Sequence, residues 1–156
     1  MITADIATTD ATKTNRQHVT LGTVPRSRIS EYWPLLRPLL ESAMSHGMRL
    51  PVDALLADAY LGNVTLWAVV VDDRIVGAAA TQVIDYSGGQ SALRVVALSG
   101  DQFSLWEAKI IEAFERTARS FGAQTIEAVG RKGWARKLDR YGFEPRYVTF
   151  IKEVKA

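Results

Sequence analysis

The chain has 156 residues, a formal net charge of +2, 47% hydrophobic residues and no cysteine. This length suits one domain with a substantial core, and the interspersed charges give no general reason to expect nucleic-acid binding. The lack of cysteine excludes disulfides and thiolate chemistry. No apolar run approaches the length that crosses a membrane, and the N-terminus lacks the pattern of a secretory signal, so we expect a cytoplasmic protein.

The first 17 residues are rich in Thr and Ala, poor in large apolar side chains and without periodicity. Such a segment is disordered on its own. We therefore expect residues 1–17 to form a polar arm that becomes ordered only by docking, either on the domain at residues 18–156 or on a partner. A protein partner, or a second copy of the chain, would bind through this arm.

Alternation and apolar runs predict the elements of the first two thirds of the chain. Pro51 suits the first turn of a helix, whereas Pro34 and Pro38 should delay or bend the helix that Ser30 caps. The expected elements are strand 18–24, helix 30–46, helix 52–61 and strands 64–71, 74–84 and 92–98.

The sequence of the last third of the chain predicts a helix, a strand, a second helix and a final strand. Ser104 and Glu107 have the spacing of a capping box, so the first of these helices is expected to begin near Leu105. The next elements are a short buried strand at 124–129, a helix at 134–141 that ends at Gly142, and a strand at 146–154.

The whole order is strand, two helices, three strands, helix, strand, helix, strand. A strand-helix-strand unit of this length favours a parallel crossover with the helix packed on the sheet. We therefore predict a mixed α/β (α+β) fold, with a central twisted sheet of about six strands flanked by helices in a single domain. A ligand would lie where strand ends meet a helix N-terminus, near residues 99–104.

Two local patterns are typical of a known family. The hairpin sequence VVVDDRIVGAAA places a polar turn between apolar strands, and an Arg-rich helix runs into Tyr141-Gly142-Phe143. Together with the order of elements, they resemble the GNAT superfamily of acyl-CoA-dependent N-acetyltransferases over residues 19–154. The resemblance implies an acetyl-CoA cofactor and transfer of its acetyl group to an amine. It implies cofactor contacts from Val96, Leu98, Gly100, Gln102, Phe103 and Ser104.

The chain departs from the family pattern where the cofactor is held. The family places glycines in the loop before its central helix, because the cofactor phosphates approach the backbone closely. Here the loop has one glycine, Gly100, and carries Asp101 together with the bulky Phe103 and Trp106. Leu138 stands where many members have the Tyr that protonates the departing thiolate. The chain also has room for one final strand where the family commonly has two.

Three residues are candidates for acid–base chemistry. Glu127 and Asp85 could act as a general base at strand ends, and Tyr141 could act as an acid. The simpler explanations are a paired or strand-edge Glu127, a solvated Asp85 and a packed Tyr141 ring, because no His or second carboxylate stands at a telling spacing. His18 and His46 are too isolated for a metal site, so no metal is expected.

A basic cluster lies on and just before the last predicted helix. It could contact phosphates of CoA or nucleic acid, or form a solvated helix face, and the solvated face is the simpler explanation. Its members are Arg131, Lys132, Arg136, Lys137 and Arg140.

The departures favour a non-catalytic GNAT-like protein that serves in assembly and needs no cofactor. Degenerate GNAT folds occur in phage-encoded proteins, including virion proteins of short-tailed phages, and this similarity makes a virion location the alternative to the cytoplasm. The alternative function is an acyl-CoA-dependent N-acetyltransferase. An open groove between the fourth and fifth predicted strands, with free amides at residues 100–104, would favour the enzyme; a groove filled by Phe103 or Trp106 would not.

Overall fold

The computed structural model describes the backbone of residues 7–14 and all atoms of residues 17–45 and 50–156. The described strands form one six-stranded sheet in chain order, β1-β2-β3-β4-β5-β6. Neighbouring strands are antiparallel except β5 and β6, which are parallel. The strands are β1 (Ala7–Thr14), β2 (Gln17–Thr23), β3 (Thr65–Val71), β4 (Arg74–Asp85), β5 (Ser91–Gly100) and β6 (Thr125–Ala128).

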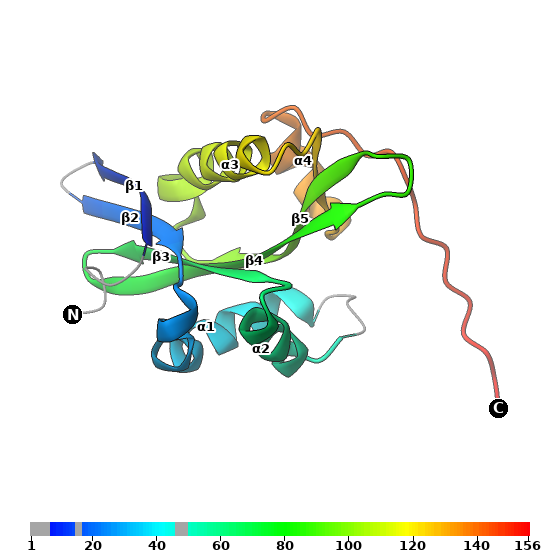
Figure 1. Ribbon diagram of the computed structural model, residues 1–156, viewed down its shortest axis with the longest axis horizontal. Coiled ribbons are helices and arrows are strands. Elements are labelled where there is room, and N and C mark those ends of the chain that lie inside the picture. The colour runs from blue at the N-terminus through cyan, green and yellow to red at the C-terminus, as the bar shows by residue number, and fades with distance from the viewer. Residues whose placement is uncertain (1–6, 15–16, 46–49) are drawn as a thin grey trace.

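Helices cover both faces of the sheet (Figure 1). On one face lie α1 (Ile29–Met44) and α2 (Val52–Leu61), and on the other lie α3 (Phe103–Ser120) and α4 (Lys132–Asp139). A 3-10 turn at Arg26–Arg28 leads from β2 into α1. The prediction of a mixed α+β domain, with a mixed sheet between helices, is confirmed.

Successive side chains of the central strands point to opposite faces of the sheet, and each face packs in a separate hydrophobic core. On β3, Leu66, Ala68 and Val70 belong to the core beneath α1 and α2, whereas Trp67, Val69 and Val71 belong to the core beneath α3. All of these side chains are buried. A strand covered on both faces needs an apolar residue at every position, which is why its sequence has no polar alternation.

The prolines of α1 lie on its outer side. The helix runs from Ile29 to Met44 through Pro34 and Pro38, and both prolines are exposed. Each removes the amide that would bond the carbonyl four residues earlier. Because residues four apart share one face of a helix, both unpaired carbonyls lie on the solvent side, where water can bond them. The helix therefore does not start late, and its predicted end at His46 lies outside the described residues.

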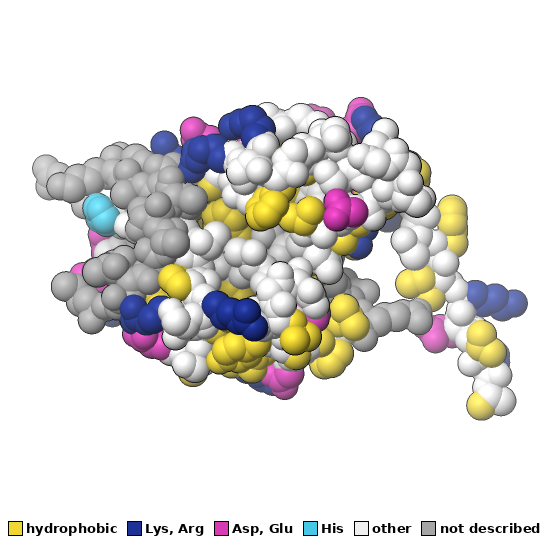
Figure 2. Space-filling view, viewed as in Figure 1, with side chains coloured by type: hydrophobic (Ala, Val, Ile, Leu, Met, Phe, Trp, Pro, Cys, Tyr) yellow, Lys and Arg dark blue, Asp and Glu magenta, His cyan; other side chains and the backbone are white. Residues whose placement is uncertain are grey.

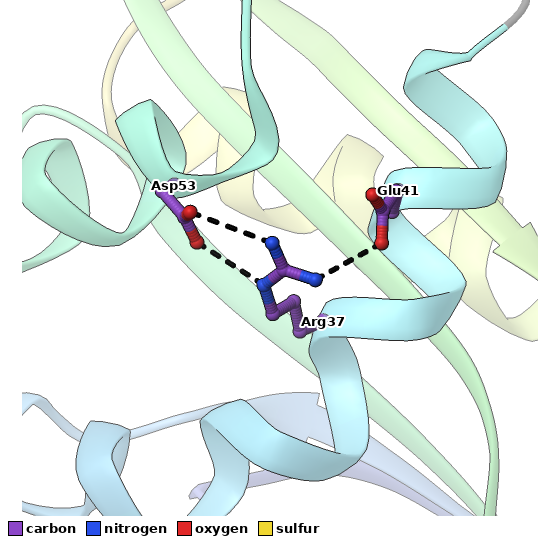
Figure 3. Close-up of polar contacts among 3 residues, drawn as sticks. All are labelled: Arg37, Glu41 and Asp53. Atoms are coloured by element: carbon purple, nitrogen blue, oxygen red, sulfur yellow. Dashed lines mark hydrogen bonds and ion pairs between the residues drawn. The ribbon is translucent and has the colours of Figure 1, made fainter.

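Arg37 links α1 to α2 (Figure 3). Its Nε and Nη2 donate to the two carboxylate oxygens of Asp53 on α2, at 3.1 and 3.4 Å. Its Nη1 donates to Glu41 Oε2 at 3.0 Å, one turn further along α1. These side chains are largely exposed, so the ion pairs add little stability and α2 is held mainly by its buried apolar residues.

Two predicted segments differ from the structure at the ends of the chain. Residues 146–154 form no strand, and the tail that contains them runs away from the domain (Figure 1). Instead, β1 pairs antiparallel with β2, from Ala7 opposite Thr23 to Thr14 opposite Gln17. Backbone pairing needs no apolar side chain, so the composition of this segment gave no signal. The described part of the predicted arm thus lies in the domain's own sheet, while residues 1–6 and 15–16 lie outside the described part.

The start of α3 also differs from the prediction. The helix begins at Phe103, after Gln102 in the left-handed conformation with φ of 55°. Ser104 therefore lies inside the first turn, and its predicted capping box with Glu107 is wrong. Glu107 instead accepts a hydrogen bond from Arg140 Nη1 at 3.1 Å.

The strand β6 is shorter and more exposed than predicted. It forms one edge of the sheet, and both Thr125 and Ala128 are exposed. The prediction of a buried strand at 124–129 is wrong, because no further strand among the described residues covers this edge.

Trp106 of α3 lies on a floor made by two glycines of the sheet. Its side chain is fully buried, and its Nε1 donates to the carbonyl of Asp101 at 2.9 Å. A Cβ added to Gly77 would lie 2.7 Å from Trp106 Cζ2, and a Cβ added to Gly100 would lie 3.0 Å from the same atom. The missing side chains on β4 and β5 therefore let α3 approach the sheet.

Replacing Gly77 with Ala should destabilise the fold, because the new methyl group would overlap the indole of Trp106. We expect the free energy of unfolding to fall by about 1–3 kcal/mol, the usual range for overpacking a core. Urea unfolding followed by tryptophan fluorescence measures the change. Gly88→Ala is the matched control, because nothing lies within 4 Å of its Cβ position. An equal loss in both variants would contradict the packing explanation.

Candidate functional site

A β-bulge interrupts the pairing of β4 with β5. Ala80 lies opposite Ala97 and Thr81 opposite Val95, so Val96 is the extra residue on β5. As a result, Val96 and Ala97 both pack in the core beneath α1, and Leu98 returns to the core beneath α3. The bulge thus shifts the side-chain alternation by one residue, so each later side chain of β5 points to the opposite face from the one it would otherwise have.

The parallel pairing of β5 with β6 ends at the same place. The last pair joins Val95 with Ala128, and from Val96 to Gly100 no described strand lies beside the second edge of β5. A cleft of about 390 Å³ opens there. It is lined by the end of α1, the second half of β5, the start of α3, the segment after β6 and the inner side of α4.

The backbone of β5 offers amides to this cleft. The amide of Asp101 donates to the carbonyl of Val76 on β4 at 2.8 Å. Because amide directions alternate along an antiparallel strand, the amides of Leu98 and Gly100 point to the other edge, where the strand has no neighbour.

The N-terminus of α3 adjoins the same cleft, with Phe103 in its lining. No side chain caps this helix end, and its first turn contains no acidic residue. An uncapped helix N-terminus presents unpaired amides and the positive end of the helix dipole, which together favour an anion.

Aromatic and basic side chains form the opposite wall. The ring of Phe103 makes edge-to-face contacts with Trp106 and with Trp134 of α4, with centroids 4.7 and 5.3 Å apart. Lys137 Nζ lies 5.4 Å from the ring centroids of both Phe103 and Trp134. Lys137 and Arg131 are the two charged residues among the described lining, and both are cations. This wall therefore suits an anionic ligand.

No family model matches the chain, and no curated protein matches its sequence. Solved structures do match. An aminoglycoside acetyltransferase from an uncultured soil metagenomic sample has a TM-score of 0.64 at 17% identity, covering 88% of this chain and 97% of that chain. Aminoglycoside N-acetyltransferase AAC(6')-Iy, in complex with CoA, has a TM-score of 0.65 at 16% identity, covering 90% and 97%. The ribosomal-protein-alanine N-acetyltransferase from Brucella melitensis has a TM-score of 0.64 at 15% identity, covering 87% and 99%.

The chain has the GNAT fold. The fold resemblance inferred from the sequence is therefore confirmed, whereas at these identities the similarity extends to the fold alone. No comparison bears on the predicted similarity to phage virion proteins.

The residues predicted to contact a cofactor lie around the cleft of this GNAT domain. Val96, Leu98, Gly100 and Phe103 line it, whereas Gln102 and Ser104 are adjacent in the chain but outside the described lining. The lack of a side chain at Gly100 serves packing, because a Cβ there would lie 2.6 Å from Gly77 Cα.

The groove is not filled by Trp106. That side chain is buried beneath the cleft and is absent from its described lining, whereas Phe103 does line it. Trp106 and Phe103, which the sequence analysis treated as equivalent ways to fill the groove, thus lie in different positions. Trp106 supports the floor, and Phe103 narrows the opening toward Trp134.

Glu127 is held by two neighbours on the sheet edge. Arg94 Nε and Nη2 donate to its Oε2 at 3.2 and 3.1 Å, and the Tyr86 hydroxyl donates to its Oε1. The hydrogen bond from Tyr86, and after it those from Arg94, lowers the pKa of Glu127 below its usual value. The same bond raises the pKa of Tyr86. A carboxylate stabilised in this way is a weaker base, and Glu127 lies outside the described lining of the cleft.

The other two acid–base candidates also lie outside that lining. Asp85 is opposite Ser91 at the far end of the β4–β5 hairpin from Gly100. Tyr141 packs against the core beneath α3, and burial followed by the nearby Glu107 carboxylate raises the pKa of its hydroxyl.

Two features of the cleft escaped the sequence analysis. Ser42 and Ala43, at the end of α1, line the cleft although they are distant in the chain from the other lining residues. The basic cluster on α4 is divided: Arg131 and Lys137 line the cleft, whereas Arg140 pairs with Glu107. The helical spacing of the cluster could have suggested the division, but nothing in the sequence indicated Ser42 or Ala43.

No helix among the described residues is long and apolar enough to cross a membrane. Nor does the described part of the chain hold a group of three or more His, Cys, Asp or Glu side chains placed to bind a metal ion.

Replacing Glu127 with Gln should change the acid side of the stability profile. Since folding lowers the pKa of this carboxyl, its ionised form stabilises the fold above the unfolded value of 4.5, and this stabilisation is lost as pH falls through the folded pKa. We expect E127Q to be less stable than wild type at neutral pH by under about 1 kcal/mol, because the pair is partly exposed.

At the acid end of the range the two proteins should converge. Urea unfolding from neutral pH down to about pH 3 measures both regimes. Glu115→Gln, which removes a carboxylate from the exposed face of α3, is the matched control. A constant difference between E127Q and wild type at every pH would contradict the linkage to this carboxyl.

Proposed function

We propose that the chain is an acyl-CoA-dependent N-acyltransferase and that the cleft between β5 and β6 binds the acyl-pantetheine arm of its cofactor. One observation carries the proposal: the strands separate at the Val96 bulge, and the resulting cleft runs to an uncapped helix N-terminus. Strand edge, helix end and cavity thus lie in one continuous site.

The charges and shape of the site fit such a cofactor. The N-terminal amides of α3 and the side chains of Arg131 and Lys137 offer positive charge to phosphates. The rest of the lining combines apolar side chains with the backbone of β5 and of the segment after β6, which suits a flexible, weakly polar arm. One of the similar solved structures, aminoglycoside N-acetyltransferase AAC(6')-Iy, is a complex with CoA, and that cofactor is consistent with this lining.

The protein's contribution to transfer would be positioning and backbone polarisation. A thioester, when bound, supplies an activated acyl group to an attacking amine. The amide of Leu98 would donate a hydrogen bond to the thioester carbonyl oxygen, and Arg131 and Lys137 would hold the phosphates. As the amide bond forms, the C–S bond would break and CoA would leave as a thiolate. No Asp, Glu, His or Tyr is among the described lining residues, so water would take the amine's proton and protonate the thiolate.

The acceptor amine would approach from the side of α1. The basic side chains lie on the α4 wall, whereas Ser42 and Ala43 at the end of α1 bring no charge to the opposite wall. A neutral amine can therefore reach the thioester there without passing the cations.

Calorimetric titration with acetyl-CoA and with free CoA tests the binding step. We expect micromolar affinity in the wild type and a loss of about tenfold, or 1.4 kcal/mol, in Arg131→Ala and in Lys137→Ala. Lys132→Ala is the matched control, because Lys132 is a cation of the same helix outside the described lining. Equal losses in all three variants would indicate a diffuse charge effect and count against a defined site.

Release of free CoA tests the transfer step. Because the chain has no cysteine, a thiol reagent would report only the thiol released from the cofactor. Turnover that requires an added primary amine would support the N-acyltransferase, and binding without turnover across an amine panel would remove the catalytic part of the proposal.

A second candidate function is a non-catalytic GNAT-like assembly protein, and the aromatic wall favours it. The edge-to-face contact of Phe103 with Trp134 joins α3 to α4 across the mouth of the cleft, where an extended cofactor would pass. The absence of an acid or base from the described lining also fits a lost activity. A virion role stays a prediction from the sequence alone.

Trp134→Ala separates the two candidates. If the ring contact closes the cleft, the wild type should bind no CoA at millimolar concentration. Trp134→Ala should then bind CoA with a dissociation constant at least tenfold below one millimolar. If the wild type already binds at micromolar strength, the non-catalytic candidate loses its main support. Calorimetry measures both proteins, and Trp134→Phe, which keeps an aromatic ring, is the control.

A further inference from the structure

A second cavity lies where β4 extends beyond the start of β3. The strand β4 has 12 residues and β3 has 7, and Thr81 of β4 lies opposite Thr65, the first residue of β3. Residues 82–85 of β4 therefore have no described strand beside them on that side. A cavity of about 390 Å³ opens at this step in the sheet. Its volume falls in the range of roughly 300–1,000 Å³ that is usual for small-molecule sites.

This second cavity is distinct from the cleft of the proposed function. Thr117 and Phe121 line it at the end of α3, and Gly62 and Asn63 line it just after α2. The described linings of the two cavities have no residue in common. A ligand of the second cavity can therefore be detected independently of a ligand of the cleft.

The backbone of β4 offers both a donor and an acceptor to the second cavity. The amide of Tyr86 donates to the carbonyl of Gln90 at 2.8 Å, so the backbone groups of Tyr86 point toward β5. Because these directions alternate along an antiparallel strand, the N–H and C=O of Val83 point to the opposite edge, where β3 has ended. Val83 is among the lining residues, so its backbone adds a hydrogen-bonding pair to the cavity.

Three side chains of the lining add further hydrogen-bonding groups. The Thr81 hydroxyl is buried and accepts from Trp67 Nε1 at 2.9 Å, so its own proton is available to donate. The Thr117 hydroxyl donates to the carbonyl of Ala113 at 2.9 Å, so its oxygen is available to accept. Asn63 is exposed, and its side-chain amide has both kinds of group. Donors and acceptors thus occur together around this cavity.

The rest of the lining is uncharged. Among the described lining residues there is no Asp, Glu, Lys, Arg or His. The middle of Figure 2, between α3 and α2, is likewise drawn mainly in white and yellow. The apolar part of the lining includes Leu93, which is buried, and Phe121, which is 62% exposed. An accessible aromatic ring beside uncharged donors and acceptors suits a ligand that combines hydroxyl groups with an apolar face.

We propose that the second cavity binds an uncharged sugar ring. Each hydroxyl of a sugar both donates and accepts hydrogen bonds, which matches the mixed groups of Thr81, Thr117 and Val83. The C–H groups on the face of the ring are attracted to the negative face of an aromatic ring such as that of Phe121. A charged ligand would lose hydration there without gaining a counter-charge. The proposal goes beyond the proposed function, because it concerns a different cavity.

The tryptophans give a test that reports each cavity separately. Trp67 donates to Thr81 of the second cavity, whereas Trp134 lines the cleft. NMR of the indole N–H groups, assigned from single Trp→Phe variants, follows a titration of the full chain with glucose. We expect the Trp67 signal to shift with a dissociation constant of about 1–10 mM and the Trp134 signal to stay in place. No shift of Trp67 up to about 100 mM glucose, or a shift of Trp134 alone, would overturn the proposal.

Glucuronate tests the chemical class of the ligand. It keeps the sugar ring but carries a carboxylate, for which the described lining holds no cation. We expect it to bind at least tenfold more weakly than glucose in the same titration. Equal affinity for the two compounds would contradict a site for uncharged sugars.

Phe121→Ala and Asn63→Ala test the place of binding. Both residues are exposed, so neither change should disturb the fold. We expect each variant to bind glucose about tenfold more weakly, through loss of ring stacking or of hydrogen bonds. Phe150→Ala is the matched control, because it removes the same ring from a position that is 92% exposed and outside the described lining. Unchanged affinity in both variants, or an equal loss in Phe150→Ala, would overturn the proposal.

Discussion

The Val96 bulge is the constraint on which the candidate site depends. One extra residue on β5 changes the side-chain alternation at the point where β6 ends, so the second half of β5 keeps its pairing with β4 but loses its neighbour on the other side. An unpaired strand edge inside a folded domain needs a partner for its amides. The cleft opens at that place, and α3 and α4 form its walls.

The floor and the wall of the cleft have different physical origins. Trp106 is fixed from below by glycines on β4 and β5 and by the carbonyl of Asp101, so it belongs to the core. Phe103 and Trp134 meet above it through an edge contact, which allows movement more readily than close packing does. The floor is therefore closely packed, and whether the cleft admits an extended anionic cofactor depends on the contact between Phe103 and Trp134.

Electrostatics distinguishes the cleft from the Glu127 carboxylate on the sheet edge. Glu127 is stabilised in its charged form by Tyr86 and Arg94, whereas the cleft presents only Arg131 and Lys137 as charged groups within its described lining. The arrangement favours binding an anion over accepting a proton.

The sequence by itself determined the order of the elements from β2 to α4 and the central position of the apolar strand at 64–71, because these depend on local periodicity and on burial of both strand faces. The GNAT fold was a resemblance of that order and of two local patterns, which the solved structures confirm. It also predicted a ligand near residues 99–104, and the structure has a cleft at the end of β5 and the start of α3. It could not determine that residues 7–14 extend the sheet, because backbone pairing carries no side-chain pattern. Only the tertiary structure separated Trp106 from Phe103, paired Glu107 with Arg140, and brought Ser42 beside β5, since each depends on contacts between segments distant in the chain.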